Sequence, residues 1–173
     1  NRNPIQTSNT NGYEIPKEPR MQVRKIENKE DYIDLLLEAD PSKDMIHKYL
    51  NDSDVYALKK GDELISIAVI LHIDRKTLEL KNIVTTEKYR NKGYAKTLLK
   101  SLCGNYKQKY DRMLVGTTEN NIPFYVKQGF DKYEKTIKNF FIDNYDEKIK
   151  DGDLICTDLI YYSKDLKKKF KDN

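Results

Sequence analysis

One short segment has the residue types of a phosphate-binding turn, namely Arg90-Asn91-Lys92-Gly93-Tyr94-Ala95. It follows a predicted strand and opens a predicted helix, where successive backbone N–H groups are unpaired and lie at the positive end of the helix dipole. Gly93 lets the backbone approach a ligand closely, the small Ala95 leaves room, and Arg90 and Lys92 add positive charge. The segment alone fits either a phosphate site or a tight turn between a strand and a helix.

Several other chemistries lack their residues in this chain. The segment has neither the GxxxxGK[ST] spacing of a P-loop nor the three glycines of GxGxxG, which disfavours nucleotide hydrolysis and hydride transfer. Cys103 and Cys156 stand far apart, and with only His47 and His72 beside them they do not form a metal-binding pattern. The same shortage of histidine disfavours a Ser-His-Asp or Cys-His nucleophile.

The elements around this segment follow from the spacing of apolar residues. The strand before it is expected over residues 77–85 as the third strand of an antiparallel meander, and a long helix with one apolar face begins at Tyr94. Asn28 is expected to cap an earlier helix, Pro41 to restart a second one, and Gly129 to close a short helix over 122–128. Further strands are expected at residues 23–26, 55–58, 63–73, 113–117, 130–137 and 156–162.

Length and charge favour one folded domain with short extensions. The chain has 173 residues, 38% of them apolar, and 32 Lys and Arg against 28 Asp and Glu give a net charge of +4. That charge lies at the ends, so a nucleic-acid surface is not expected. We expect an N-terminal extension or cloning remnant over 1–20, the domain over 21–163 and a basic tail over 164–173. No signal peptide or membrane span is evident, so the cytoplasm is the expected location.

Two runs in the sequence together resemble the GNAT superfamily of acyl-CoA-dependent N-acetyltransferases. The first extends from Leu78 to Ala95 and ends in the [RQ]xxGx[GA] pattern, and the second is the FYVKQGF run of residues 124–130. The likeness covers about residues 21–162. It implies an α/β (α+β) fold: a mixed, mostly antiparallel sheet of about six to seven strands, splayed between strands 4 and 5 and flanked by about four helices.

The resemblance also implies a site for acetyl-CoA as co-substrate, with no metal. The backbone of Val84 and Thr85 would pair with the pantetheine amides, and the N–H groups of residues 91–95 would hold the pyrophosphate, with Asn120 as a further candidate contact. The sequence departs from the family pattern at Thr85, where an apolar residue is common, and at Thr118, where asparagine is often found.

Two side chains match the catalytic positions of that family. Glu79 would remove a proton from the attacking amine, because an alkyl amine with a pKa near 10 is almost fully protonated at neutral pH. Tyr125 would protonate the departing thiolate. The alternatives are a strand carboxylate that is exposed or paired with Lys81, and a tyrosine that serves only for packing.

The acceptor is less defined by the sequence. Residues 139–158 carry a net charge of −4, which favours a small cationic amine if this connection borders the acceptor cleft, and Tyr145, Asp146 and Glu147 are the candidate contacts. The alternative is a solvated acidic loop. The expected function is acetyl transfer to a small-molecule amine by a monomer or homodimer, without nucleic acid or membrane. A protein or peptide acceptor, or a non-catalytic acyl-CoA sensor, remains open.

Overall fold

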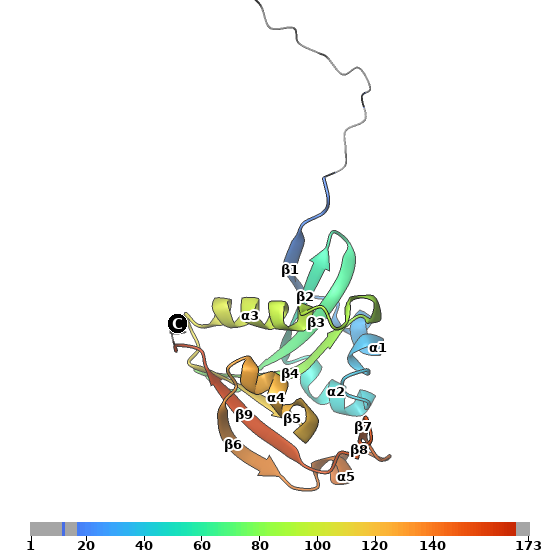
Figure 1. The fold of residues 1–173 in the computed structure, drawn as a ribbon, viewed down its shortest axis with the longest axis vertical. Helices are drawn as coiled ribbons and strands as arrows, with labels where there is room; N and C mark the ends of the chain where they lie inside the picture. Colours follow the sequence, from blue (N-terminus) through green and yellow to red (C-terminus); the bar gives the residue numbers. More distant parts are fainter. Residues whose placement is uncertain (1–11, 13–16, 169–173) are drawn as a thin grey trace, which may run out of the picture.

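A computed structural model describes residue 12 and residues 17–168, and its centre is a seven-stranded sheet (Figure 1). The sheet strands are β1 (Met21–Ile26), β2 (Ser53–Lys60), β3 (Glu63–His72), β4 (Thr77–Thr85), β5 (Arg112–Thr117), β6 (Lys132–Ile137) and β9 (Leu159–Asp165), and a hairpin comprises β7 (Lys150–Asp151) and β8 (Leu154–Ile155). The helices are α1 (Ile33–Leu36), α2 (Lys43–Leu50), α3 (Tyr94–Tyr106), α4 (Ile122–Lys127) and α5 (Phe140–Asn144), with 3₁₀ turns at Lys29–Tyr32, Glu87–Tyr89 and Glu119–Asn121. The sheet order is β1-β2-β3-β4-β5-β9-β6.

Helices cover both faces of the first half of the sheet. Successive β3 side chains point to opposite faces, so Ala68 packs with the apolar residues of α3 while Val69 packs with those of α1 and α2. The α3 side also receives the fully buried Phe130, which follows α4. Two buried clusters therefore hold β4 between them, which fixes the strand that carries Glu79.

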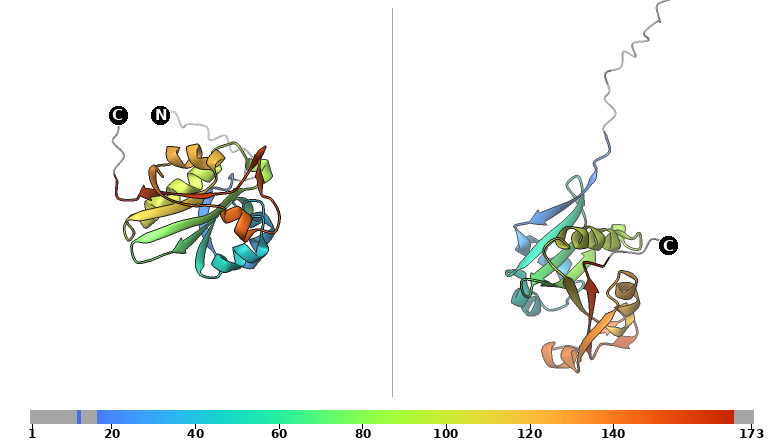
Figure 2. Two further views of the ribbon diagram at one scale, coloured as in Figure 1. Left: turned by 90° about the horizontal axis from the view of Figure 1, so that it is seen from below. Right: turned by 90° about the vertical axis from the view of Figure 1, so that its left-hand side faces the viewer.

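Strands β4 and β5 run parallel and then separate, whereas every other neighbouring pair in the seven-stranded sheet is antiparallel. Their pairing ends at Leu80 opposite Val115. On the other side of β4, the register with β3 skips Lys81, which marks a β-bulge at that residue. Figure 2 shows the strands β1–β4, blue to green, grouped apart from β5, β9 and β6, yellow to red. The splayed mixed sheet expected from the sequence is therefore confirmed.

Most elements lie where the sequence predicted them, and the differences fall near the ends and in the last third. The helix expected after Asn28 begins as a 3₁₀ turn, and the Asn28 side chain makes no capping bond. The last strand starts at Leu159 rather than residue 156 and continues past 163 to Asp165. Residues 139–158, expected to be a long connection, contain α5 and the β7–β8 hairpin.

The extensions expected at the two ends lie mostly outside the described residues, because residues 1–11, 13–16 and 169–173 are not described. Leu166, however, is buried and packs in the α3-side cluster. Within residue 12 and residues 17–168, no helix has the length and apolar character needed to span a membrane. The same residues contain no group of three His, Cys, Asp or Glu placed to hold a metal ion.

Candidate active site

The turn before α3 is open, and its backbone donors have no helical partners. Gly93 has φ +82° and Asn91 has φ +60°, so the chain makes a left-handed turn there before the helix begins. The first hydrogen bond of α3 runs from the Thr97 N–H to the Gly93 carbonyl at 3.0 Å, which leaves the three preceding N–H groups without a helical partner. A Cβ placed on Gly93 would meet nothing within 4 Å. The predicted phosphate turn therefore has room for a ligand.

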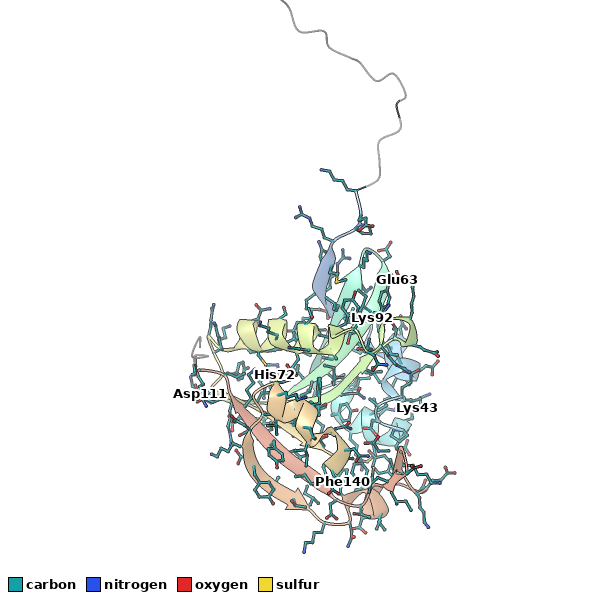
Figure 3. The ribbon with its side chains drawn as sticks, in the orientation of Figure 1. Lys43, Glu63, His72, Lys92, Asp111 and Phe140 are labelled. Carbon is teal, nitrogen blue, oxygen red and sulfur yellow. The ribbon has the colours of Figure 1, made fainter. Side chains whose placement is uncertain are left out.

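A pocket of about 710 Å³ lies over this turn, and we call it the loop pocket. Seven of the predicted cofactor residues line it: Val84, Thr85, Arg90, Asn91, Gly93, Tyr94 and Ala95. Lys92 lies beside it, exposed at the start of α3 (Figure 3). Arg90 donates from Nε to the Thr85 carbonyl at 3.0 Å and forms an ion pair with Glu38, so its guanidinium is held at the pocket wall.

The edge of β4 beside the loop pocket presents backbone groups that no strand pairs with, although the Thr85 carbonyl accepts from Arg90 Nε. In an antiparallel pair, every second residue exchanges hydrogen bonds with the neighbouring strand. The N–H of Thr86 donates to the carbonyl of Ile65 on β3 at 2.9 Å, so Val84, two residues earlier, also pairs with β3. By the same alternation, the backbone groups of Ile83 and Thr85 point to the side where β5 has separated. Of the two residues expected to pair with pantetheine, Thr85 has backbone groups on this side, whereas those of Val84 point to β3, where the Val84 carbonyl also accepts from Ser66 Oγ. Ile83 is an additional residue that only the register identifies.

Two further pockets continue from the loop pocket along the opening of the sheet. The tyrosine pocket, about 410 Å³, is lined by Tyr125 and shares Glu38 and Ile83 with the loop pocket. The glutamate pocket, about 320 Å³, is lined by Glu79 and shares Leu80 and Lys81 with the tyrosine pocket. Glu79 and Tyr125 thus line adjoining pockets rather than separate surfaces of the molecule.

Glu79 is buried, with 7% of its surface exposed, and its carboxylate is held by two partners. Lys81 forms an ion pair with Oε2 at 2.7 Å, and the Tyr161 hydroxyl donates to the same oxygen at 3.5 Å. The pairing with Lys81, an alternative that the sequence left open, is therefore present. Among the described residues, Oε1 has no hydrogen-bond partner, so one carboxylate oxygen is available to a ligand in the glutamate pocket.

Tyr125 is placed by the short helix that the sequence predicted. Pro123 stands in the first turn of α4, and Gly129, with φ +94°, ends the helix so that the Phe130 N–H returns to the Tyr125 carbonyl at 3.0 Å. The Tyr125 ring packs edge-on against Phe124 and Phe130. Burial raises the pKa of its hydroxyl to about 12, and that hydroxyl has no hydrogen-bond partner among the described residues.

The predicted acceptor-side residues divide into two groups. Tyr145 lines both the tyrosine and glutamate pockets, and its hydroxyl donates to Asp40 at 2.7 Å. Asp146 and Glu147 are exposed and line neither pocket. Asn120, predicted for the cofactor, donates its side-chain amide to the Asp151 carbonyl at 3.1 Å, which ties the turn before α4 to the β7–β8 hairpin.

Several residues of these pockets were not predicted. They include Glu38, Asp40, Tyr49, Lys81 as a pocket residue, Phe140, Phe141, Cys156 and Tyr161. The Tyr49 hydroxyl donates to Asp40 at 3.1 Å and accepts from the Asn82 amide at 3.2 Å. Burial, together with the negative charge of Asp40, raises the pKa of Tyr49. Spacing in the sequence gives no signal for such contacts, because the partners come from distant segments.

Comparison with known proteins gives one consistent result. The profile described as "Acetyltransferase (GNAT) family" matches residues 19–130. Over 144 residues the chain is 33% identical to the Bacillus subtilis protein named Uncharacterized N-acetyltransferase YvbK, covering 81% of this chain and 92% of that protein. The crystal structure of a GNAT family acetyltransferase from Elizabethkingia anophelis with acetyl-CoA bound is similar at a TM-score of 0.75 and 32% identity, over 84% of this chain and 97% of that one. The crystal structure of a Bacillus subtilis acetyltransferase in complex with CoA is similar at a TM-score of 0.74 and 32% identity, over 84% of this chain and 99% of that one.

Proposed function

Because the chain belongs to the GNAT acetyltransferase family and is an acetyl-CoA-dependent acyltransferase, we propose that it acetylates the primary amine of a small cationic molecule. The proposed route is direct transfer in a ternary complex of protein, acetyl-CoA and amine. The observation that carries this proposal is the continuous series of three pockets, with the phosphate turn at one end, Tyr125 between and Glu79 at the other end.

The loop pocket fits the pyrophosphate and pantetheine of the cofactor. The unpaired N–H groups at the start of α3 would bind the pyrophosphate, helped by the helix dipole. The outward-facing backbone groups of Ile83 and Thr85 would pair with the pantetheine amides as an additional strand would. In this position the thioester reaches the tyrosine pocket, where β4 and β5 have separated.

Glu79 is proposed as the base. The acceptor arrives as an ammonium ion and must lose a proton before its nitrogen can attack the thioester carbonyl. Glu79 lines the glutamate pocket, and its Oε1 has no hydrogen-bond partner among the described residues, so it can accept that proton directly or through one water. Lys81 and Tyr161 hold Oε2, which fixes the orientation of the carboxylate.

Tyr125 is proposed as the acid. As the C–N bond forms and the C–S bond breaks, the electron pair leaves on sulfur, and a coenzyme A thiolate has a basicity close to that of cysteine, with a pKa of about 8.5. A hydroxyl whose pKa is about 12 stays protonated at neutral pH and has a proton to donate to the sulfur. The nitrogen loses its second proton as the tetrahedral intermediate collapses to the amide, and that proton restores the Tyr125 hydroxyl by way of solvent, while Glu79 releases the first proton of the amine to solvent.

Direct transfer is favoured over an acetyl-cysteine intermediate by the state of both thiols. Cys103 is buried in the α3-side cluster, and burial raises its pKa. Cys156 lines the tyrosine pocket, but burial and the nearby charge of Asp151 raise its pKa as well. Both sulfurs therefore stay protonated, and a protonated thiol is a poor nucleophile.

The shape and charge of the acceptor side support a small cationic amine over a peptide. Residues of α5 and of the β7–β8 hairpin line the tyrosine pocket, which makes a confined space rather than an open groove. Four carboxylates, those of Glu38, Asp40, Glu79 and Asp151, line the two acceptor-side pockets, against three ammonium groups, those of Lys48, Lys81 and Lys150. The excess of one negative charge favours a cationic acceptor.

The test combines ligand binding with thiol release. Acetyl-CoA at about a hundred times its Kd should stabilise the protein by about 2.7 kcal/mol, and ATP or NAD at the same concentration should not. Addition of a primary amine should then release coenzyme A thiol and give the N-acetyl product. Stabilisation by acetyl-CoA without thiol release on any amine would support the sensor, and absence of stabilisation would overturn the cofactor site.

A further inference from the structure

The glutamate pocket is walled by aromatic side chains from three separate segments. Its lining includes Tyr49 from α2, Phe140, Phe141 and Tyr145 from α5 and the residue after it, and Tyr161 from β9. The three rings near α5 form one cluster: the centroids of Phe140 and Phe141 are 5.3 Å apart, and those of Phe141 and Tyr145 are 5.5 Å apart. Figure 3 labels Phe140 at the end of the molecule that carries α5.

The polar atoms of this aromatic wall are already bound to one another. The hydroxyls of Tyr49 and Tyr145 donate to the two oxygens of Asp40, and the hydroxyl of Tyr161 donates to Glu79. Both oxygens of Asp40 therefore accept hydrogen bonds, and each of these tyrosine hydroxyls already uses its one hydrogen-bond donor. What the wall offers a ligand is ring surface, and the one carboxylate oxygen left without a partner among the described residues lining this pocket is Oε1 of Glu79.

Cations already lie over two of the five rings. The ammonium of Lys81 lies 5.3 Å from the centroid of Tyr49, and that of Lys135 lies 4.9 Å from the centroid of Tyr161. In the described part of the chain, no cation lies over the rings of Phe140, Phe141 or Tyr145. These three rings are the surface that remains for the body of the acceptor.

We propose that the acceptor is an arylalkylamine, a primary amine joined by a short alkyl chain to a flat aromatic group. This inference rests on the proposed function and specifies its substrate class. The amine reaches Oε1 of Glu79 while the aromatic group packs against Phe140, Phe141 and Tyr145, where edge-on and offset ring contacts are favourable. A volume of about 320 Å³ accommodates one such ring with its side chain.

Polyamines and aminosugars fit this wall less well. A second ammonium of a polyamine would need a free carboxylate inside the pocket, and both oxygens of Asp40 are engaged by the tyrosines. The hydroxyls of an aminosugar would lose their hydrogen bonds with water against the ring surfaces without gaining equivalent partners. The pocket therefore selects for a hydrophobic body with a single charged end.

The experiment measures kcat/KM by thiol release for 2-phenylethylamine, n-butylamine, spermidine and glucosamine at saturating acetyl-CoA. We expect 2-phenylethylamine to exceed n-butylamine by about tenfold or more, since the two amines share an ethylamine unit and a phenyl group removes more apolar surface from water than the ethyl group in its place, and gains ring contacts. A higher value for spermidine or glucosamine would overturn the arylalkylamine inference and leave the proposed function in place. No product from any of the four amines, despite binding of acetyl-CoA, would overturn both.

Paired variants on α5 test the wall itself. Phe140→Ala should lower the preference for 2-phenylethylamine over n-butylamine by about fivefold, with the Kd for acetyl-CoA unaltered. Ile142→Ala is the matched control, because Ile142 lies on the same helix, is 61% exposed and lines none of the three pockets. Phe140→Leu keeps an apolar side chain without a ring and serves if the alanine variant fails to fold. An unchanged preference in a folded Phe140 variant would overturn the inference.

Discussion

Replacing Tyr125 by phenylalanine removes one oxygen atom and tests the proposed acid directly. The hydroxyl has no hydrogen-bond partner among the described residues, so its removal leaves no protein group unsatisfied. The ring contacts with Phe124 and Phe130, at centroid distances of 5.1 and 5.8 Å, are kept in phenylalanine. We therefore expect the free energy of unfolding to change by less than about 1 kcal/mol.

The rate should change far more than the stability. A positioned general acid contributes about a hundred- to ten-thousand-fold. At about 1.36 kcal/mol per tenfold, this corresponds to a rise of about 2.7 to 5.4 kcal/mol in the activation barrier. The loss should appear in kcat, while the Kd for acetyl-CoA stays within about twofold, because the proposed cofactor site is at the turn before α3 rather than at the phenol.

The assay is thiol release at saturating amine and acetyl-CoA, compared between Tyr125→Phe and Tyr133→Phe. Tyr133 is a suitable control because it is 56% exposed and its hydroxyl bonds to Thr136 on the same strand, away from the three pockets. Since the pKa of Tyr125 is raised to about 12, the loss should be similar from pH 6 to pH 10. A Tyr125→Phe variant that turns over within threefold of the wild-type rate would refute the assignment. So would a wild-type kcat that falls with a midpoint well below pH 11, if Tyr125→Phe abolishes that fall.

Three further changes test the rest of the site and the fold. Glu79→Gln should lower kcat/KM by about a hundredfold or more at pH 7, and the deficit should shrink toward pH 10, where more of the amine is already neutral; a pH-independent deficit would argue against a base. Gly93→Ala should weaken acetyl-CoA binding and cost about 1 kcal/mol of stability, because φ +82° is strained for alanine; calorimetry and thermal melts measure both, and a wild-type Kd and Tm would contradict the geometry assigned to this turn. Burial raises the pKa values of Tyr49, Tyr125 and Tyr161 above their ordinary value near 10, so above pH 10 the folded state keeps protons that the unfolded chain releases. The free energy of unfolding should therefore be unaffected by these groups below about pH 10 and fall as the pH rises above it. Equal urea midpoints at pH 8 and pH 11 would contradict this.

The parts of the site that the sequence predicted are those built by neighbouring residues. The turn at Gly93 and the helix end at Gly129 each depend on a positive φ in a short segment, and both positions are glycine. The face of α3 that packs on the sheet follows from its helical spacing. Local geometry of this kind is encoded in a few consecutive residues, which is why these two motifs could be placed without a structure.

The parts that the sequence did not predict depend on distant pairs. The bond between Tyr145 and Asp40 joins residues 105 positions apart, and the contact between Tyr161 and Glu79 joins residues 82 positions apart. The acidic count over 139–158 suggested several carboxylates at the acceptor cleft, but Asp151 is the one from that stretch that lines these pockets. The residues of α5 instead contribute rings, which a charge count does not register.

The bulge at Lys81 connects the fold to the arrangement of the site. The side chains of β4 that pack on the α3 side are Leu78, Leu80 and Ile83, so their spacing is two residues before the bulge and three across it. The alternation of side chains between the two faces of β4 therefore shifts by one residue at Lys81. Before the bulge, β4 pairs with β5; after it, the strand edge is free for a ligand, because the pairing has ended at Leu80. The bulge also leaves Lys81 between the two acceptor-side pockets with its ammonium on Glu79. One inserted residue therefore sets where the edge of β4 opens for the proposed cofactor site and which ammonium group accompanies Glu79, the proposed base. A regular strand with the same composition would not make this arrangement.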